Sequence, residues 1–261
     1  MRCAAVQKLV KHFKNDPDTK NILKDHATQD DNGEVRFTAI AELAENFKDD
    51  PDTKNILKDH ASQDDYEDVR RIAVRELAKH FKDDPDTKTF LKDCATHDDS
   101  GDVRCDAVQA LAKNFKDDPD TKTFLKECAT QNDNWNVRRA AVEELAKNFK
   151  EDPDTKSFLK ERATQDDHSD VRGAAVQELA KHFKYQLELF EIYYHCAVND
   201  PFKDSHDRFN NPNPRRIALE IIIKQFPQHE QTLSLLRDRT ENDPDEQVRE
   251  FAQEKLKQWE V

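Results

Sequence analysis

Eight arginines recur along the sequence at a fixed interval. Six are 34 residues apart, and the last two continue the series after one nine-residue insertion. They are Arg2, Arg36, Arg70, Arg104, Arg138, Arg172, Arg215 and Arg249. On a helical wheel each lies in the middle of an apolar stripe. A guanidinium there needs an acid, because an unpaired buried charge is costly. We predict a structural ladder of paired arginines and no catalytic role for them.

Two lysine columns also align from unit to unit. The first contains Lys20, Lys54, Lys88, Lys122 and Lys156, and the second contains Lys24, Lys58, Lys92, Lys126 and Lys160. Stacked lysines could hold phosphate or an acidic peptide. An acid follows each lysine of the second column, as Asp25, Asp59, Asp93, Glu127 and Glu161. We therefore favour a solvated face of mixed charge.

A third column has metal-ligand chemistry. It contains His26, His60, Cys94, Cys128, Arg162 and Cys196. Side chains one unit apart lie about 10 Å from each other, too far to share a zinc ion bound at about 2.0–2.3 Å. The paired aspartates lack the ligand spacing of an EF-hand. We predict a half-buried packing column and no metal site.

The other signs of an active site are missing from the sequence. It contains only three glycines, which excludes a phosphate-binding loop or dinucleotide fingerprint. No nucleophile and general base can be placed together on one helix face. We predict no catalytic residues, no cofactor and no enzymatic activity.

Each period of 34 residues encodes two helices. In the third unit, an apolar stripe follows Arg70 and ends near Phe81, and a second stripe runs from Phe90 to Ala95. Between them Asp84 is suited to cap the second helix, with Pro85 as its first residue. Because such a unit cannot bury its apolar face alone, the units must stack.

The repeated sequence motif is an Asp-rich turn followed by Val-Arg-x-x-Ala-x-x-x-Leu, and it resembles HEAT repeats over essentially the whole chain. The resemblance implies an all-α, right-handed α-solenoid of about 7.5 HEAT-like helical hairpins. It also implies that each ladder arginine reaches a turn carboxylate of the adjoining repeat. On this basis we expect Arg104→Ala to destabilise the array strongly by stranding that acid.

The repeats divide into a regular and a divergent part. We predict regular units over residues 1–184 and divergent units over 185–261, with an inserted loop at 200–214 and a capping helix at 247–259. In the divergent part, Tyr193 and Tyr194 are expected to fill the core. The first unit begins without the usual acidic turn, so its N-terminal face is expected to continue into or dock on another repeat. A frayed terminal repeat is the alternative.

Partner-binding residues are predicted where the units differ most, on either side of the ladder arginine and in the insertion. Aromatic residues mixed with arginine have the composition of an interface hot spot. The candidates are Phe37, Tyr66, Arg71, Ile72, Trp135, Arg139, His168, Phe202 and Phe209. Neutral variation at loop tips is the alternative.

The net charge limits the classes of binding partner, and the cysteine content indicates the redox compartment. A net charge of −13 argues against nucleic acid and anionic membranes, and five scattered cysteines suit a reducing cytoplasm. The wording ELAKHFKDDPDTKTFLK resembles HEAT-type arrays at the C-termini of bacterial NACHT-type NTPases. That resemblance implies a non-enzymatic protein–protein interaction scaffold, the recognition or regulatory arm of a larger signalling assembly. The alternatives are a HEAT-like enzyme of the bilin lyase type and a self-assembling spacer.

Overall fold

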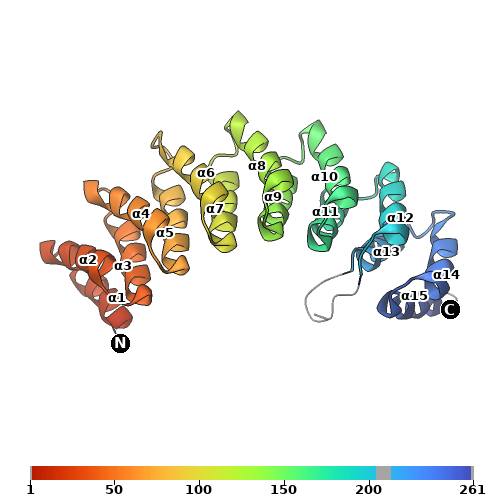
Figure 1. Cartoon of the computed structure of the whole chain (residues 1–261), viewed down its shortest axis with the longest axis horizontal. Helices are drawn as coiled ribbons and strands as arrows, with labels where there is room; N and C mark the ends of the chain where they lie inside the picture. The colour runs from red at the N-terminus through yellow and green to blue at the C-terminus, as the bar shows by residue number, and fades with distance from the viewer. Residues whose placement is uncertain (1, 204–212, 260–261) are drawn as a thin grey trace. The chain divides into compact units, whose positions relative to one another are not determined.

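The computed structural model describes residues 2–203 and 213–259, and these are helical repeats throughout (Figure 1). Over these ranges it contains fifteen α-helices, one short 3-10 helix and no strand, which confirms the predicted all-α repeat fold. Among the described helices, none is long and apolar enough to cross a membrane.

The helices fall into two sets that alternate along the chain. The first helices carry the ladder arginines: α1 (Arg2–Phe13), α3 (Gly33–Asn46), α5 (Glu67–His80), α7 (Gly101–Asn114), α9 (Trp135–Asn148), α11 (Ser169–His182), α13 (Pro214–Gln225) and α15 (Glu246–Trp259). The second helices are α2 (Pro17–Gln29), α4 (Pro51–Gln63), α6 (Thr87–His97), α8 (Pro119–Gln131), α10 (Pro153–Gln165), α12 (Phe190–Asn199) and α14 (Thr232–Asn242), and η1 (Leu187–Leu189) precedes α12.

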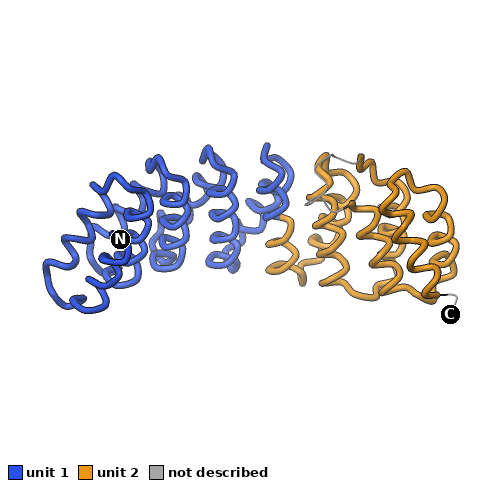
Figure 2. Tube along the Cα trace, turned by 90° about the horizontal axis from the view of Figure 1, so that it is seen from below, with its two compact units in different colours: residues 1–141 blue, residues 142–261 orange. Residues whose placement is uncertain are grey.

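The chain forms two compact units, Met1–Ala141 and Val142–Val261, and the division falls within α9 (Figure 2). In the first unit, α1, α3, α5 and α7 lie side by side in one layer, and α2, α4 and α6 form a second layer (Figure 1). In the second unit, α11 and α13 are neighbours in the same way.

The two helices that pack most tightly are not the two that the sequence analysis placed in one 34-residue unit. The second helices α2, α4, α6, α10, α12 and α14 pack most extensively on the first helix that follows each of them, and less on the one before it. The reason is the shared core: Leu57 and Ala61 of α4 and Val69 and Ala73 of α5 are almost completely buried. The Asp-rich turn therefore lies inside the hairpin, and the Pro-containing turn joins one hairpin to the next.

Aspartate and proline begin most of the second helices. Asp50, for example, accepts a hydrogen bond at 3.0 Å from the amide of Asp52, with Pro51 at the first helical position. α6 is an exception: it begins at Thr87 after Asp86, so the predicted N-cap at Asp84 is wrong. There the carboxylates of Asp84 and Asp86 both bind Lys54 of the preceding repeat.

A buried threonine near the start of several second helices ties them to the preceding helix. The hydroxyl of Thr53 donates to the carbonyl oxygen of Phe47 at 2.8 Å, and Thr19 and Thr232 make the equivalent bonds to Phe13 and Phe226. Threonine also recurs two residues after the proline as Thr87, Thr121 and Thr155, but their buried hydroxyls have no hydrogen-bond partner among the described residues.

The second unit contains the divergent repeats. Tyr193 is fully buried and lies 6.0 Å from the ring of Phe226, whereas Tyr194 is half-buried. Helix α15 presents Gln253 and Lys257 to solvent. The inserted loop was expected at 200–214, and its residues 204–212, which include Phe209, lie outside the described residues.

Candidate functional site

A ladder rung, meaning a ladder arginine with the residue 28 positions later, has a repeated geometry. Arg36 donates from Nε to Asp64 Oδ2 at 2.8 Å and from Nη2 to Oδ1 at 2.7 Å. Its Nη1 donates to the carbonyl oxygen of Asp30, six residues earlier, at 3.0 Å. The guanidinium thus bridges the turn of its own hairpin and the turn of the next.

Four further rungs have a buried or nearly buried carboxylate 28 positions after the arginine. Arg2 binds Asp30 at 3.0 Å, Arg70 binds Asp98 at 2.9 Å, Arg172 binds Asp200 at 2.7 Å, and Arg215 binds Asp243 at 3.2 Å. Two other ladder arginines reach the carbonyl six residues earlier: Arg138 donates to Asn132 at 3.0 Å and Arg249 donates to Asp243 at 2.6 Å.

The rung acid Asp64 is held in its charged form. Burial would by itself raise the pKa of Asp64, but hydrogen bonds from Arg36, the Tyr66 amide and His60 outweigh it and lower the pKa to about 2. His60 Nδ1 lies 2.8 Å from Asp64 Oδ2. His60, and likewise His26 beside Asp30, therefore support the ladder in addition to packing.

The lysine columns form a second set of ion pairs between repeats. Lys24 lies 2.7 Å from both Asp50 and Asp52, and Lys88 lies 2.6 Å from Asp118. The acids come from the start of the next second helix and not from the adjacent positions such as Asp25. Burial raises the pKa of Asp50, but hydrogen bonds from its lysines prevail and lower it to about 2. These lysines are consequently neutralised within the array.

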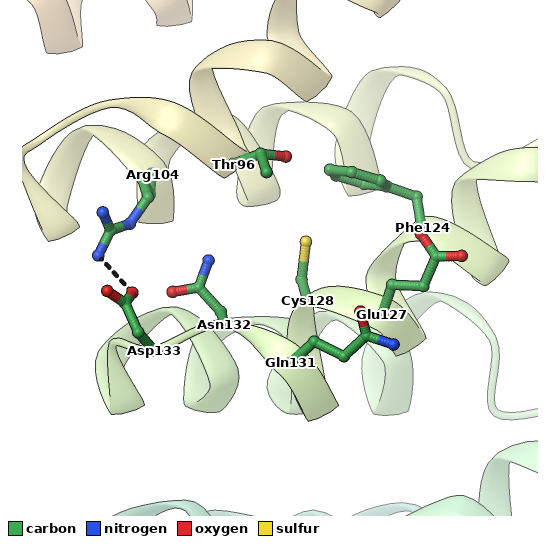
Figure 3. Close-up of a pocket in the computed structure, with 8 residues that line it drawn as sticks. All are labelled: Thr96, Arg104, Phe124, Glu127, Cys128, Gln131, Asn132 and Asp133. Carbon is green, nitrogen blue, oxygen red and sulfur yellow. Dashed lines mark hydrogen bonds and ion pairs between the residues drawn. The ribbon is translucent and has the colours of Figure 1, made fainter.

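One rung of the first unit departs from the pattern, because residue 132 is asparagine. Arg104 keeps the bond from Nη1 to the carbonyl of Asp98 at 2.8 Å. Its Nη2 donates at 3.1 Å to Asp133, whose side chain is almost fully exposed. Its Nε is buried and has no hydrogen-bond partner among the described residues. A cavity of about 350 Å³ opens beside this rung (Figure 3).

The predicted partner-binding residues differ widely in exposure. Tyr66 is exposed, with 46% of its surface accessible. Phe37, Ile72 and Trp135 are half-buried, although a partner-binding role favours exposed side chains. Arg139 is exposed.

Three of the other candidates have structural contacts. Arg71 binds Asp106 at 2.7 Å and Asp68 at 3.1 Å. His168 accepts a hydrogen bond from the Asp170 amide at 3.3 Å as the N-cap of α11. The carbonyl of Phe202 accepts a bond from Arg215 at 3.0 Å. These contacts account for three residues without requiring a partner.

An acidic residue that was not among the predicted site residues lies at the centre of a cluster on α5 and α7. Asp106 is buried and binds both Arg71 and Arg75, the latter at 2.8 Å. A cavity of about 410 Å³ lies between Arg75, Asp106 and Lys113. The signal in the sequence was an acid at a position that is Ile72 and Ala140 in the neighbouring repeats.

One group of side chains has the composition of a metal site. Ligand atoms of Glu45, Glu76 and His80 lie within 4.8 Å of one another. Lys79 Nζ lies 2.6 Å from Glu45 and 3.5 Å from Glu76, so a side-chain cation already binds both carboxylates of the group. The cysteines of the third column are poor ligands and nucleophiles, because burial raises the pKa of the Cys94 and Cys128 thiols to about 12.

The stacked two-layer hairpins and their arginine–aspartate ladder define a helical-repeat protein. The family model described as HEAT repeats matches residues 1–78, 21–112 and 89–180, and the chain belongs to this family. The X-ray structure of the Escherichia coli protein YibA is similar at 19% sequence identity, with a TM-score of 0.52 over 97% of this chain and 85% of that chain. A search of curated proteins found no match.

Proposed function

We propose that this chain is a non-enzymatic scaffold that binds a protein partner at the Asp-rich turns of its repeats. One observation carries the proposal: Tyr66 is exposed at a turn where other repeats have small or polar residues. Its ring packs on Gly33 of the preceding repeat so closely that an added Cβ would lie 2.7 Å from it. A large aromatic held rigid at the surface loses little entropy on binding, as interface hot spots do.

The state of the reactive groups supports binding over catalysis. The thiols of Cys94 and Cys128 are held protonated, and the histidines beside Asp30 and Asp64 serve the ladder. The alternative of a bilin lyase predicts that titration with bilin produces a new absorption band. Such a band would contradict a purely non-enzymatic role.

Capture from native lysate with quantitative mass spectrometry tests the scaffold. The bait proteins are the wild type, Tyr66→Ala, Gly33→Ala to displace the ring, and Ile22→Ala as a control at another exposed apolar residue. We expect a protein that is lost with Tyr66→Ala, reduced with Gly33→Ala and retained with Ile22→Ala. Identical captures from all four folded proteins would contradict the proposed site.

Within this role we propose a recognition or regulatory task in a larger signalling assembly. The support is the resemblance of the repeat wording to the arrays of NACHT-type NTPases. The lysate experiment also tests this point, because the captured partner should then belong to a nucleotide-dependent signalling system. A captured partner of another kind would remove this part of the proposal and leave the scaffold intact.

A further inference from the structure

The rung at Arg104 is buried like an intact rung but lacks its acid. The Arg104 side chain is 11% exposed, close to the 12% of Arg36. Asp133 corresponds to Asp65, which is an additional, exposed partner of Arg36 and not its main one. Arg104 has therefore lost the carboxylate that elsewhere binds the Nε edge.

The orientation of Asn132 directs its amide N–H group toward the side of Arg104 that has lost its carboxylate. Asn132 Oδ1 accepts a hydrogen bond from the Asn134 amide at 3.1 Å, as Asp64 Oδ1 does from the Tyr66 amide at 2.9 Å. The turn thereby fixes the amide oxygen, and Asn132 Nδ2 takes the place of the second carboxylate oxygen. Amide and guanidinium both present N–H groups there, so an acceptor is missing between them.

The adjoining cavity has the size and lining to admit that acceptor. Its volume of about 350 Å³ exceeds many times the roughly 30 Å³ share of one water molecule. Arg104, Asn132 and Asp133 line one side, and Phe124 and Glu127 lie at the other (Figure 3). The thiol of Cys128, between them, stays uncharged because burial raises its pKa to about 12.

We propose that the gap between Arg104 and Asn132 is a receptor for a single carboxylate group supplied by a ligand. One ligand oxygen accepts from the Arg104 guanidinium and the other from Asn132 Nδ2, which supplies the acceptor that the rung lacks. The nearby Glu127 and Asp133 disfavour a doubly charged anion such as phosphate. The proposal is independent of the protein-binding role, since a free carboxylate suffices.

Nuclear magnetic resonance of the arginine Nε–Hε groups tests the receptor directly. The protein is labelled with ¹⁵N-arginine, and the Arg104 signal is assigned with Arg104→Lys. Sodium acetate is titrated against sodium chloride and sodium phosphate at matched ionic strength. We expect a saturable shift of the Arg104 signal with acetate alone. No shift beyond that with chloride, or an equal shift with phosphate, overturns the proposal.

Two variants test the rungs in opposite directions: one adds the missing carboxylate at Arg104, and the other removes the carboxylate at Arg36. Asn132→Asp supplies the missing carboxylate and should abolish the acetate response. Asp64→Asn opens the same gap at Arg36 and should add a second responding signal. The decisive comparison is between the wild type and Asn132→Asp, which places at position 132 the aspartate found in the other rungs. An acetate-dependent shift of the Arg104 signal that persists in Asn132→Asp overturns the proposal.

A further comparison identifies the source of the carboxylate. A short peptide with blocked termini and one aspartate is titrated beside the same blocked peptide with asparagine. A response to the aspartate peptide at lower concentration than acetate assigns the carboxylate to a polypeptide, and the reverse order assigns it to a small molecule. If neither the aspartate peptide nor acetate moves the signal, the receptor is disproved.

Discussion

The rungs at Arg36 and Arg104 differ in one residue and in little else. Both arginines are equally buried, and both donate Nη1 to a turn carbonyl six residues earlier. Only Arg36 has a buried carboxylate across the gap. The position of a ladder arginine is therefore set by the apolar stripe and the turn carbonyl, and the acid adds charge balance. A repeat array can give up one acid without losing the place of its arginine.

The largest difference between the two rungs should appear when the arginine is removed. Arg36→Ala leaves Asp64 buried without its guanidinium, and the loss of one partner of a buried ion pair typically costs about 3–5 kcal/mol. Arg104→Ala strands no buried acid and should cost about 1–2 kcal/mol, less than the sequence-based expectation of strong destabilisation. Urea unfolding followed by circular dichroism measures both values. Equal losses would mean that the acid contributes little to either rung.

The next largest difference between the two rungs should appear in the dependence of stability on pH. Because the pKa of Asp64 is depressed to about 2, its rung contributes stability that is complete above the unfolded value near 4 and lost as pH falls through about 2. The contribution is on the order of 2 kcal/mol.

Asp64→Asn removes that titration. Its thermal midpoint should consequently fall less than that of the wild type between about pH 5 and pH 2. Arg104→Lys, at the rung without a buried acid, is the control and should follow the wild-type profile. Parallel profiles for the wild type and Asp64→Asn would contradict the pH dependence assigned to this rung.

Restoring the acid should have a smaller effect of opposite sign. Asn132→Asp provides acceptors for Arg104 Nε and Nη2 and should raise stability by about 1–2 kcal/mol at neutral pH, measured in buffer free of carboxylates. The matched change Asp64→Asn should lower it. A destabilised Asn132→Asp protein would show that Asn132 is required by its surroundings.

The exposed acids should give the smallest difference. Asp133 is the carboxylate bound to Arg104 among the described residues, whereas Asp65 assists an arginine that already has Asp64. Asp133→Ala should therefore cost more than Asp65→Ala, with both below about 1 kcal/mol. Thermal unfolding at low and high salt measures the difference. The loss from Asp133→Ala should shrink in salt.

Much of the fold was visible in the sequence. The arginine and proline periods, with apolar residues on one helix face, predicted helical pairs, and the resemblance to HEAT repeats predicted a ladder to the adjoining repeat. The prediction of which two helices form a hairpin was wrong, because a repeat period alone does not tell on which neighbour a helix packs. The lysine partners were also misplaced. Asp50 is distant from Lys24 in sequence and is brought close only by stacking.

The candidate site was less predictable. Asn132 stands in a column of aspartates and could have been noticed, but its effect depends on the turn bond that fixes its amide. Side-chain exposure also could not be inferred: Tyr66 is exposed while Phe37, at an equally variable position, is half-buried. The difference arises from the helices on either side and not from the local sequence.

Both sets of ion pairs within the repeats have one direction along the chain. The cation always belongs to the earlier repeat and the acid to the later, as in Arg36 with Asp64 and Lys24 with Asp50. Contacts of this head-to-tail kind are open-ended, unlike self-complementary ones. Deleting or duplicating one whole 34-residue period would bring Arg36 to Asp98, or to a copy of Asp64, with every pair re-formed. The array is thus suited to change its length by unequal recombination without a new contact having to evolve.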